Sequence, residues 1–218
     1  MQYPNLLIVN KPKGFTSNDI VQMIKKHFHY QKVGHGGTLD PNATGVLVIG
    51  INEGTKALHG LTNDHKQYIA EVKFGASTDT YDVEGKITKH ASFEHIKLED
   101  IRSIFERLKK EGYQQTPPIY SAIKIKGKKL YDYARQQQTV EIIPRATQIL
   151  DYEIKEFHDG SLTIKIDVPK GFYVRSLAHD LGVWLNSAAF LNNLIRTRSG
   201  QFEITQAVDF AELMKTSV

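Results

Sequence analysis

The chain has 218 residues and contains no cysteine. Disulfide bonds and thiolate metal ligands are therefore excluded, so the interior has to be held by packing and polar contacts alone. No run of about eighteen consecutive apolar residues occurs either, and the N-terminus lacks the basic and apolar segments of a secretion signal. We therefore expect a cytoplasmic protein that is neither secreted nor inserted in a membrane.

A strong excess of one charge sign is also missing, because 28 lysines and arginines stand against 24 acidic residues, a formal net charge of +4. The distribution of the basic residues is more informative than their total. They form separate clusters: Lys11 and Lys13; Lys25, Lys26, His27, His29 and Lys32; Lys124, Lys126, Lys128 and Lys129; Arg196 and Arg198. Such clusters either face solvent on helices and turns or bind a polyanion such as nucleic acid at several points.

Repeats, low-complexity segments and long linkers do not occur, so we expect a single domain over residues 1–218. Apolar periodicity predicts strands at residues 6–10, 46–51, 68–74 and 120–125, a hairpin turning at Asp159-Gly160, a helix capped by Ser17 or Asn18, and further helices ending at Gly112, over 130–135 and from about Val174. Strands outnumber helices and hairpins are present. The pattern indicates an α+β protein with a mixed, largely antiparallel central sheet flanked by helices and loops.

Residues 34–45 read GHGGTLDPNATG and place one carboxylate, Asp40, among four glycines. The stretch has neither the GxxxxGK[ST] order of a nucleotide-phosphate loop nor the GxGxxG spacing of a dinucleotide site. His35 and Asp40 offer two metal ligands with no third nearby, although His59 or His65 could be recruited by folding, so we expect no metal. What remains is a carboxylate acting alone as nucleophile or acid and base, or an Asp-Pro turn that only bonds its own backbone.

The longer stretch GHGGTLDPNATGVLVIG resembles the catalytic motif of the TruB family of tRNA pseudouridine-55 synthases, with Asp40 at the position of the essential aspartate. Further blocks resemble family motifs in the same order: NKPKGFTS (10–17), KQYIAEVKFGASTDTYDVEG (66–85), TPPIYSAIKIKGKKLYDYAR (116–135), KGFYVRSLAHDLG (170–182) and LIRTRSG (194–200). The resemblance implies the pseudouridine synthase catalytic fold and the isomerisation of uridine 55 in the T-loop of transfer RNA. It also implies a monomer that needs no cofactor.

The same resemblance assigns catalytic roles. Asp40 would be the nucleophile, Tyr68 the aromatic platform that also helps to remove the C5 proton, and Arg175 the cation that pairs with Asp40. Core packing is the alternative for Tyr68, and a solvent-facing position at a helix start is the alternative for Arg175. Attack on C1′, attack on C6 and elimination through a glycal all stay open.

The resemblance assigns substrate-binding roles as well. His35 would fill the space left by the flipped base, Tyr173 would contact the uridine or the nucleophile, and Leu194 would line the uracil pocket. Lys11 would be mainly structural or would touch a phosphate. A flipped base loses a few kcal/mol of stacking, and an aromatic platform returns about 1 to 3 kcal/mol of it.

Some positions depart from the family pattern. Gly36 stands where threonine or alanine is frequent, Phe190 where histidine is frequent, and Ile195 replaces the first of two arginines while Arg196 remains. We therefore expect one RNA or pocket contact to be missing. We also expect no PUA-type C-terminal domain, which many bacterial relatives carry. The competing function is a catalytically idle RNA-binding or RNA-folding module, or a synthase for another RNA.

Overall fold

The computed structural model describes residues 5–61, 64–121, 123–125, 127–136 and 138–216, which form two compact units. Unit 1 comprises Met1–Ile69 and Asn193–Val218, and unit 2 comprises Ala70–Asn192. Strands β4 (Lys66–Phe74) and β13 (Ala189–Ser199) each have residues in both units. The expectation of a single domain over 1–218 stays a prediction.

Unit 1 begins with a strand, a helix and two further strands, and its C-terminal part returns to the same sheet. Its remaining elements are β1 (Leu6–Lys11), α1 (Ser17–His27), β2 (Val33–His35), β3 (Thr44–Ile51), α2 (Gly54–Leu61), β14 (Phe202–Glu203), a 3₁₀ helix (Ile204–Gln206), β15 (Val208–Asp209) and α6 (Phe210–Leu213). The hydrogen-bonded strand order is β13-β3-β1-β15, with β2 paired to β3 and β14 to β13. Strand β3 is antiparallel to β1 and parallel to β13.

The centre of unit 1 is strand β3, whose residues Val46 to Ile49 are fully buried. A strand that is apolar on both faces has to be covered on both. On one face Val46 and Val48 form a cluster with Leu58 of α2 and Phe202 of β14. The strand begins four residues after Asp40. Its burial therefore fixes the position at which the chain segment carrying Asp40 enters the sheet.

Helix α1 starts one residue earlier than the sequence predicts. Its N-cap is Thr16, whose hydroxyl accepts from the Asp19 nitrogen at 3.0 Å while the Asp19 carboxylate accepts from the Thr16 nitrogen at 2.8 Å. This reciprocal capping box is worth on the order of 1 kcal/mol. Ser17, one of the two predicted caps, uses its hydroxyl elsewhere, on the backbone of Leu39.

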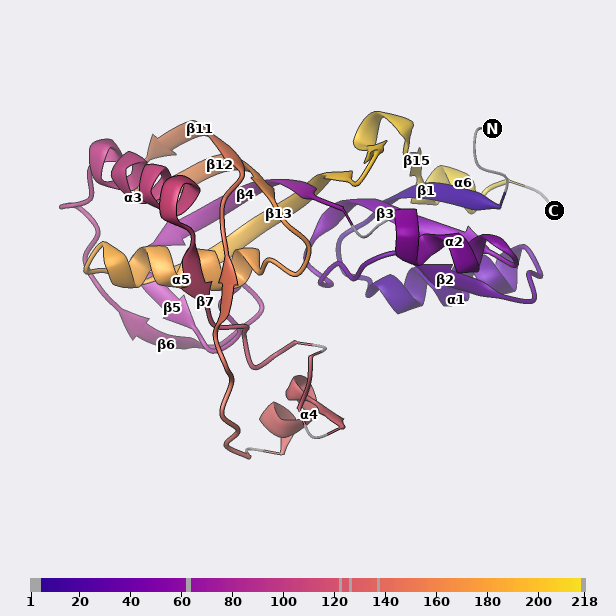
Figure 1. The fold of residues 1–218 in the computed structure, drawn as a ribbon, viewed down its shortest axis with the longest axis horizontal. Helices are drawn as coiled ribbons and strands as arrows, with labels where there is room; N and C mark the ends of the chain where they lie inside the picture. The colour runs from indigo at the N-terminus through magenta and orange to yellow at the C-terminus, as the bar shows by residue number, and fades with distance from the viewer. Residues whose placement is uncertain (1–4, 62–63, 122, 126, 137, 217–218) are drawn as a thin grey trace. The chain divides into compact units, whose positions relative to one another are not determined.

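Unit 2 is built on the strand order β11-β12-β4-β13. Its other elements are β5 (Ala76–Thr78), β6 (Ile87–His90), α3 (Leu98–Glu111), β7 (Tyr113–Gln115), β8 (Lys124–Ile125), β9 (Lys128–Lys129), α4 (Leu130–Arg135), β10 (Arg145–Thr147), β11 (Asp151–His158), β12 (Ser161–Val168) and α5 (Val174–Trp184). Figure 1 shows α3 alongside β11, and Phe105 stacks on Tyr152 at 5.1 Å between ring centroids. The mixed α+β class with a largely antiparallel sheet is confirmed.

The core of unit 2 follows the predicted periodicities. Strand β12 alternates, with every second side chain fully buried from Leu162 to Val168. The predicted hairpin joins β11 to β12, and both turn residues, Asp159 and Gly160, have positive φ, as a two-residue turn of this kind requires. The strand predicted over 120–125 is wrong in extent: only Lys124–Ile125 is extended and paired, residue 122 lies outside the described residues, and residues 120 and 121 form bends.

Candidate active site

Asp40 lies in a loop between β2 and β3 in which five consecutive backbone carbonyls, from residue 37 to residue 41, accept hydrogen bonds. The two terminal nitrogens of Arg196 donate to the carbonyls of residues 37 and 38, and the hydroxyl of Ser17 donates to the carbonyl of residue 39. The carbonyl of residue 40 accepts from the nitrogen of Ala43, and the carbonyl of residue 41 accepts from the nitrogen of Gly14 and from the Lys11 ammonium. All of these donors belong to unit 1. We call residues 36–46, which are this connection and the first three residues of β3, the Asp40 loop.

Lys11 is fully buried, although it is a lysine near the start of the chain. Its ammonium donates to the carbonyls of Pro12 at 2.8 Å, Phe15 at 2.7 Å and Pro41 at 3.2 Å. A buried ammonium has three donors to satisfy, and three carbonyl oxygens do so here. Lys11 therefore ties the turn after β1 to the residue that follows Asp40, which fits the structural role and not a contact with phosphate.

His35 ends β2 just before the Asp40 loop and is half-buried. Burial lowers the pKa of its imidazole below the ordinary 6.5, and the nearby Arg196 guanidinium adds to the lowering. Tyr68 in β4 and Leu194 in β13 are both buried in the strands, at 8% and 7% exposed. Each lies on the buried face of its strand, so core packing stays an alternative for Tyr68.

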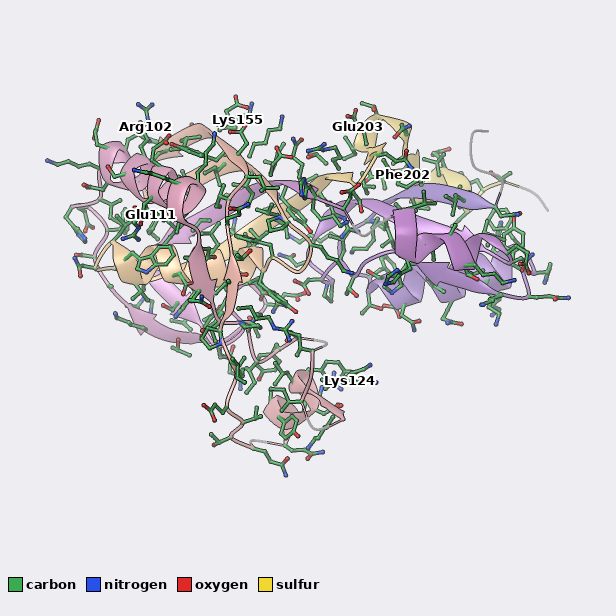
Figure 2. All side chains as sticks on the ribbon, viewed as in Figure 1. Arg102, Glu111, Lys124, Lys155, Phe202 and Glu203 are labelled. Atoms are coloured by element: carbon green, nitrogen blue, oxygen red, sulfur yellow. The ribbon has the colours of Figure 1, made fainter. Side chains whose placement is uncertain are left out.

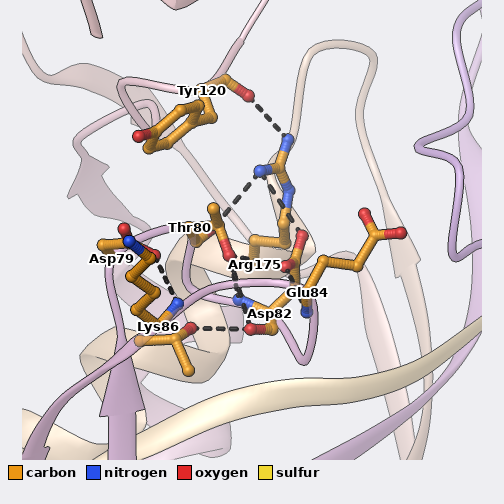
Figure 3. Close-up of polar contacts among 8 residues, drawn as sticks. Asp79, Thr80, Asp82, Glu84, Lys86, Tyr120 and Arg175 are labelled. Carbon is orange, nitrogen blue, oxygen red and sulfur yellow. Dashed lines mark hydrogen bonds and ion pairs between the residues drawn. The ribbon is translucent and has the colours of Figure 1, made fainter. Parts of the chain in front are cut away.

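In unit 2, Arg175 lies in the first turn of α5 and is 6% exposed. Its guanidinium donates to the carbonyl of Thr80 at 3.2 Å and to the carbonyl of Tyr120 at 3.0 Å, and it forms an ion pair with Asp82 at 3.6 Å (Figure 3). Both charged side chains are buried in this pair, at 7% and 8% exposed. The alternative of a solvent-facing helix-start arginine is wrong.

Asp82 belongs to a tight loop between β5 and β6, residues 79–86, which we call the Asp82 loop. Thr80 donates its hydroxyl to the Asp82 carboxylate at 2.6 Å, and the Glu84 nitrogen donates to the same carboxylate oxygen at 3.1 Å (Figure 3). Asp79 accepts from the Lys86 nitrogen at 2.8 Å across the loop. The carboxylates thus hold the loop by accepting from its own donors.

Tyr173 is the N-cap of α5 and is held by Gln115 of β7. The Gln115 amide oxygen accepts from the Tyr173 nitrogen at 2.8 Å, and the amide nitrogen donates to the Tyr173 carbonyl at 3.0 Å. This paired contact satisfies a backbone nitrogen that the helix itself leaves without a partner. Gln115 is 3% exposed, so the start of α5 is fixed within unit 2.

The predicted residues are divided between the two units. Unit 1 contains Lys11, His35, Asp40, Tyr68 and Leu194, and unit 2 contains Tyr173 and Arg175. The pairing of Asp40 with Arg175 would join the two units and stays a prediction. Sequence reasoning missed the supporting residues Ser17, Asp82, Gln115 and, in its buried role, Arg196. A signal for Asp82 existed, because four polar residues precede a glycine at 79–85 as a tight loop requires.

Metal binding gains no support from the described part of the chain, in which no group of three or more histidine, aspartate or glutamate side chains gathers to hold an ion. No helix among those residues is long and apolar enough to cross a membrane. The arrangement in unit 1 presents one carboxylate on a rigid backbone, and the arrangement in unit 2 presents one guanidinium. Such groups serve nucleophilic attack and charge stabilisation.

Comparison with known proteins identifies relatives over almost the whole chain. The sequence profile described as TruB family pseudouridylate synthase (N terminal domain) matches residues 25–174. The chain is 49% identical over 211 residues to tRNA pseudouridine synthase B of Ureaplasma urealyticum serovar 10, covering 96% of this chain and 92% of that protein. For the protein of the same name in Malacoplasma penetrans, identity is 43% over 209 residues, covering 95% and 90%.

Solved structures agree on the fold. The crystal structure of a Cbf5-Nop10-Gar1 complex matches with a TM-score of 0.74 and 26% identity, covering 96% of this chain and 53% of that one. A structure of an H/ACA RNP bound to a substrate RNA containing 2′-deoxyuridine matches with a TM-score of 0.68 at 24% identity, covering 96% and 52%, and bears on the fold alone. The chain spans about half the length of these solved chains.

Proposed function

The chain belongs to the TruB family of pseudouridylate synthases, and from this premise we propose that it isomerises uridine 55 in the T-loop of transfer RNA to pseudouridine. The observation that carries the proposal is the 49% identity, over 96% of the chain, to a tRNA pseudouridine synthase B. The geometry of the Asp40 loop supports it. A loop with five consecutive carbonyls engaged presents its central carboxylate at a defined position.

The reaction breaks the bond between ribose C1′ and uracil N1, rotates the freed ring and joins C1′ to C5. The proton leaves C5 and N1 gains one, so no atom or electron is gained overall and no cofactor is required. Asp40 is the proposed nucleophile, with attack on C1′, attack on C6 and elimination through a glycal all compatible with its position. Tyr68 is the proposed platform for the flipped base and takes part in removing the C5 proton.

The remaining residues bind and orient the substrate. His35 enters the space of the flipped base, and burial, which lowers the pKa of its imidazole, favours the neutral form. Leu194 lines the uracil pocket, and Tyr173 contacts the uridine or Asp40. The proposed role of Arg175 is to supply positive charge to the reacting carboxylate.

The segment around α4 is proposed to grip the T-arm. Lys124 is exposed there (Figure 2), and Lys128 lies over the ring of Tyr133 at 4.4 Å from the centroid. Lys129 and Arg135 both lie over the ring of Tyr131, at 5.1 Å and 5.3 Å from its centroid. Basic groups bind phosphates and aromatic faces stack on unpaired bases, so this composition suits a structured RNA loop. The proposal includes one catalytic domain over 1–218, acting as a monomer in the cytoplasm.

The test is release of tritium from transfer RNA that carries 5-tritiated uridine. Wild type should release it, Asp40→Asn should release none above background, and the exposed Asp64→Asn should match wild type. A transcript changed only at uridine 55 should give no release. Silence of the wild type, with RNA binding intact, would support an idle RNA-binding module, and release from the changed transcript would indicate another target.

A further inference from the structure

Arg196 is one of the largest fully buried side chains of the protein, at 1% exposed. Its guanidinium donates to the carbonyl of Val46 at 2.7 Å, of Thr38 at 3.3 Å and of Gly37 at 3.2 Å. Among the described residues it forms no ion pair with a carboxylate. A buried cation is costly unless its donors find partners, and here each of the three guanidinium nitrogens donates to a backbone oxygen.

The three acceptors lie at the two ends of the Asp40 loop. Gly37 and Thr38 precede Asp40, and Val46 lies in β3 after it. One planar group therefore joins the entry of the loop to its exit, with Asp40 between them. A guanidinium has donors on three nitrogens in a fixed fork, so it makes these contacts in one geometry, which a lysine ammonium does not reproduce.

The backbone register brings Arg196 to this place. Strand β13 pairs in parallel with β3, and Arg196 lies opposite Gly45. A Cβ on Gly45 would lie 2.8 Å from the Arg196 nitrogen and closer still to its carbonyl oxygen, and the φ of Gly45 is +100°. Only glycine permits this approach without strain. The glycine at the end of the loop and the arginine of β13 therefore form one packing unit.

We propose that Arg196 is a positioning residue for Asp40, acting by holding the two ends of the Asp40 loop and not by contacting RNA. The proposal rests on the proposed function, because it takes the Asp40 carboxylate as the reacting group. The sequence alone placed Arg196 in a basic cluster with Arg198, which would either face solvent or bind a polyanion. Its burial and its three carbonyl partners argue for the positioning role.

The experiment compares Arg196→Lys and Arg196→Met with the exposed Arg102→Lys on α3 (Figure 2). Single-turnover tritium release by Arg196→Lys should fall about 100-fold, because a displacement of about 1 Å costs that much. The dissociation constant for transfer RNA and its dependence on salt should not change. Thermal unfolding of each variant gives the folded fraction by which the rates are corrected. Arg102→Lys should behave as wild type.

Amide hydrogen exchange gives a readout that does not depend on activity. The nitrogen of Gly36 donates to Val48 at 2.8 Å and that of Ala43 to Asp40 at 3.1 Å, so both report on the loop. Both amides should exchange faster in Arg196→Lys, while amides of strand β12 in unit 2 keep their rates. Arg196→Met should be no more active than Arg196→Lys, because the methionine side chain has no hydrogen-bond donor for the loop carbonyls.

Three outcomes would overturn the proposal: an unchanged single-turnover rate in Arg196→Lys, unchanged exchange at Gly36 and Ala43, or a loss explained by weaker RNA binding with a smaller salt dependence. The last would make Arg196 an RNA contact. Silence of wild type would defeat the proposed function instead. In that case the exchange rates still test whether Arg196 holds the loop.

Discussion

The Asp40 loop of unit 1 and the Asp82 loop of unit 2 are each held by several hydrogen bonds, but by opposite kinds of group. The first is held by donors, since the side chains of Arg196, Lys11 and Ser17 donate hydrogen bonds to its carbonyl oxygens. The second is fixed largely by acceptors, since Asp79 and the Asp82 carboxylate accept from its nitrogens and hydroxyls.

The difference corresponds to the charge of the side chain that each loop positions. The Asp40 loop carries an acid and has two buried cations beneath it, whereas the Asp82 loop surrounds the Arg175 guanidinium with a carboxylate and a carbonyl. In each case the surrounding groups have the polarity opposite to that of the side chain being positioned. The two loops therefore respond differently to substitutions that add bulk, remove charge, relax the backbone or add salt.

The largest effect is expected from adding one methyl group to one glycine of each loop, Gly45 or Gly85. In Gly45→Ala the new Cβ meets the Arg196 backbone at a φ of +100°, so the free energy of unfolding should fall by more than about 3 kcal/mol. In Gly85→Ala the new Cβ would lie 2.3 Å from the Thr80 hydroxyl, 2.5 Å from the Asp79 carboxylate and 2.9 Å from the Thr80 backbone nitrogen. The two nearest atoms are side-chain oxygens that can rotate away, and the φ of Gly85 is not in the left-handed region, so we expect a smaller loss of about 1 to 2 kcal/mol.

Urea unfolding measures both losses, with Gly14→Ala as the control. Gly14 also has a positive φ, +88°, but a Cβ there meets nothing within 4 Å, so this variant reports the backbone strain alone, about 1 kcal/mol. Equal losses in Gly45→Ala and Gly14→Ala would contradict the close approach of Arg196 to the Asp40 loop.

The second effect concerns charge. Asp82→Asn keeps the shape of the side chain but removes the anion from a buried pair, and leaving a buried guanidinium without its anion should cost about 2 to 3 kcal/mol of stability. Tritium release should fall as well, since the Arg175 side chain loses a fixed partner. Asp79→Asn, in the same loop but exposed, should cost less than about 1 kcal/mol. If both variants unfold at the same urea concentration, the ion pair is not what holds the loop.

Local sequence patterns were sufficient for the elements in which hydrophobicity is periodic. Helices α3 and α5 and strand β12 are confirmed because each buries one regular face. Strand β13 was not predicted. Its sequence AFLNNLIRTRS buries an arginine, and hydrophobic periodicity assigns an arginine to the solvent.

The candidate site divides in the same way. The motif around Asp40 is local, so the sequence singled out its one carboxylate as a candidate nucleophile or an Asp-Pro turn, and the family resemblance then favoured the nucleophile. The groups that hold it are distant along the chain, and the contact between Arg196 and Thr38 joins residues 158 positions apart. Such contacts depend on strand register, which a single sequence does not specify. The same reason hid Asp82 and Gln115, whose partners lie on α5 or at its start.

A smaller effect is expected at Tyr81, which has a φ of +64° in the Asp82 loop and stacks on His179 at 4.0 Å between ring centroids. Tyr81→Ala removes the stack and keeps the strain, whereas Tyr81→Gly removes both. The glycine variant should therefore be more stable than the alanine variant by about 1 kcal/mol. Tyr81→Phe should retain wild-type stability. Thermal unfolding orders the three, and an alanine variant as stable as the glycine variant would show that the left-handed backbone carries no strain.

The smallest expected effect concerns the pH dependence of stability and two histidines, His35 beside the Asp40 loop and His179 stacked on Tyr81 of the Asp82 loop. Burial lowers the pKa of both His35 and His179, with Arg196 adding to the first and Lys89 to the second. Because the folded-state pKa lies below the unfolded value, each contributes stability that is present above about pH 6.5 and lost as the pH falls. His179→Phe keeps a stacking ring and should flatten this loss.

Salt distinguishes the two cations. Lys89 is exposed and is screened by salt, whereas Arg196 is buried and is not. Raising the ionic strength should therefore move the pKa of His179 upward toward its ordinary value and leave the pKa of His35 where it is. Titration of the imidazole protons by NMR at low and high salt measures both shifts. Equal shifts in the two pKa values would mean that salt screens the Arg196 charge, which would contradict its burial.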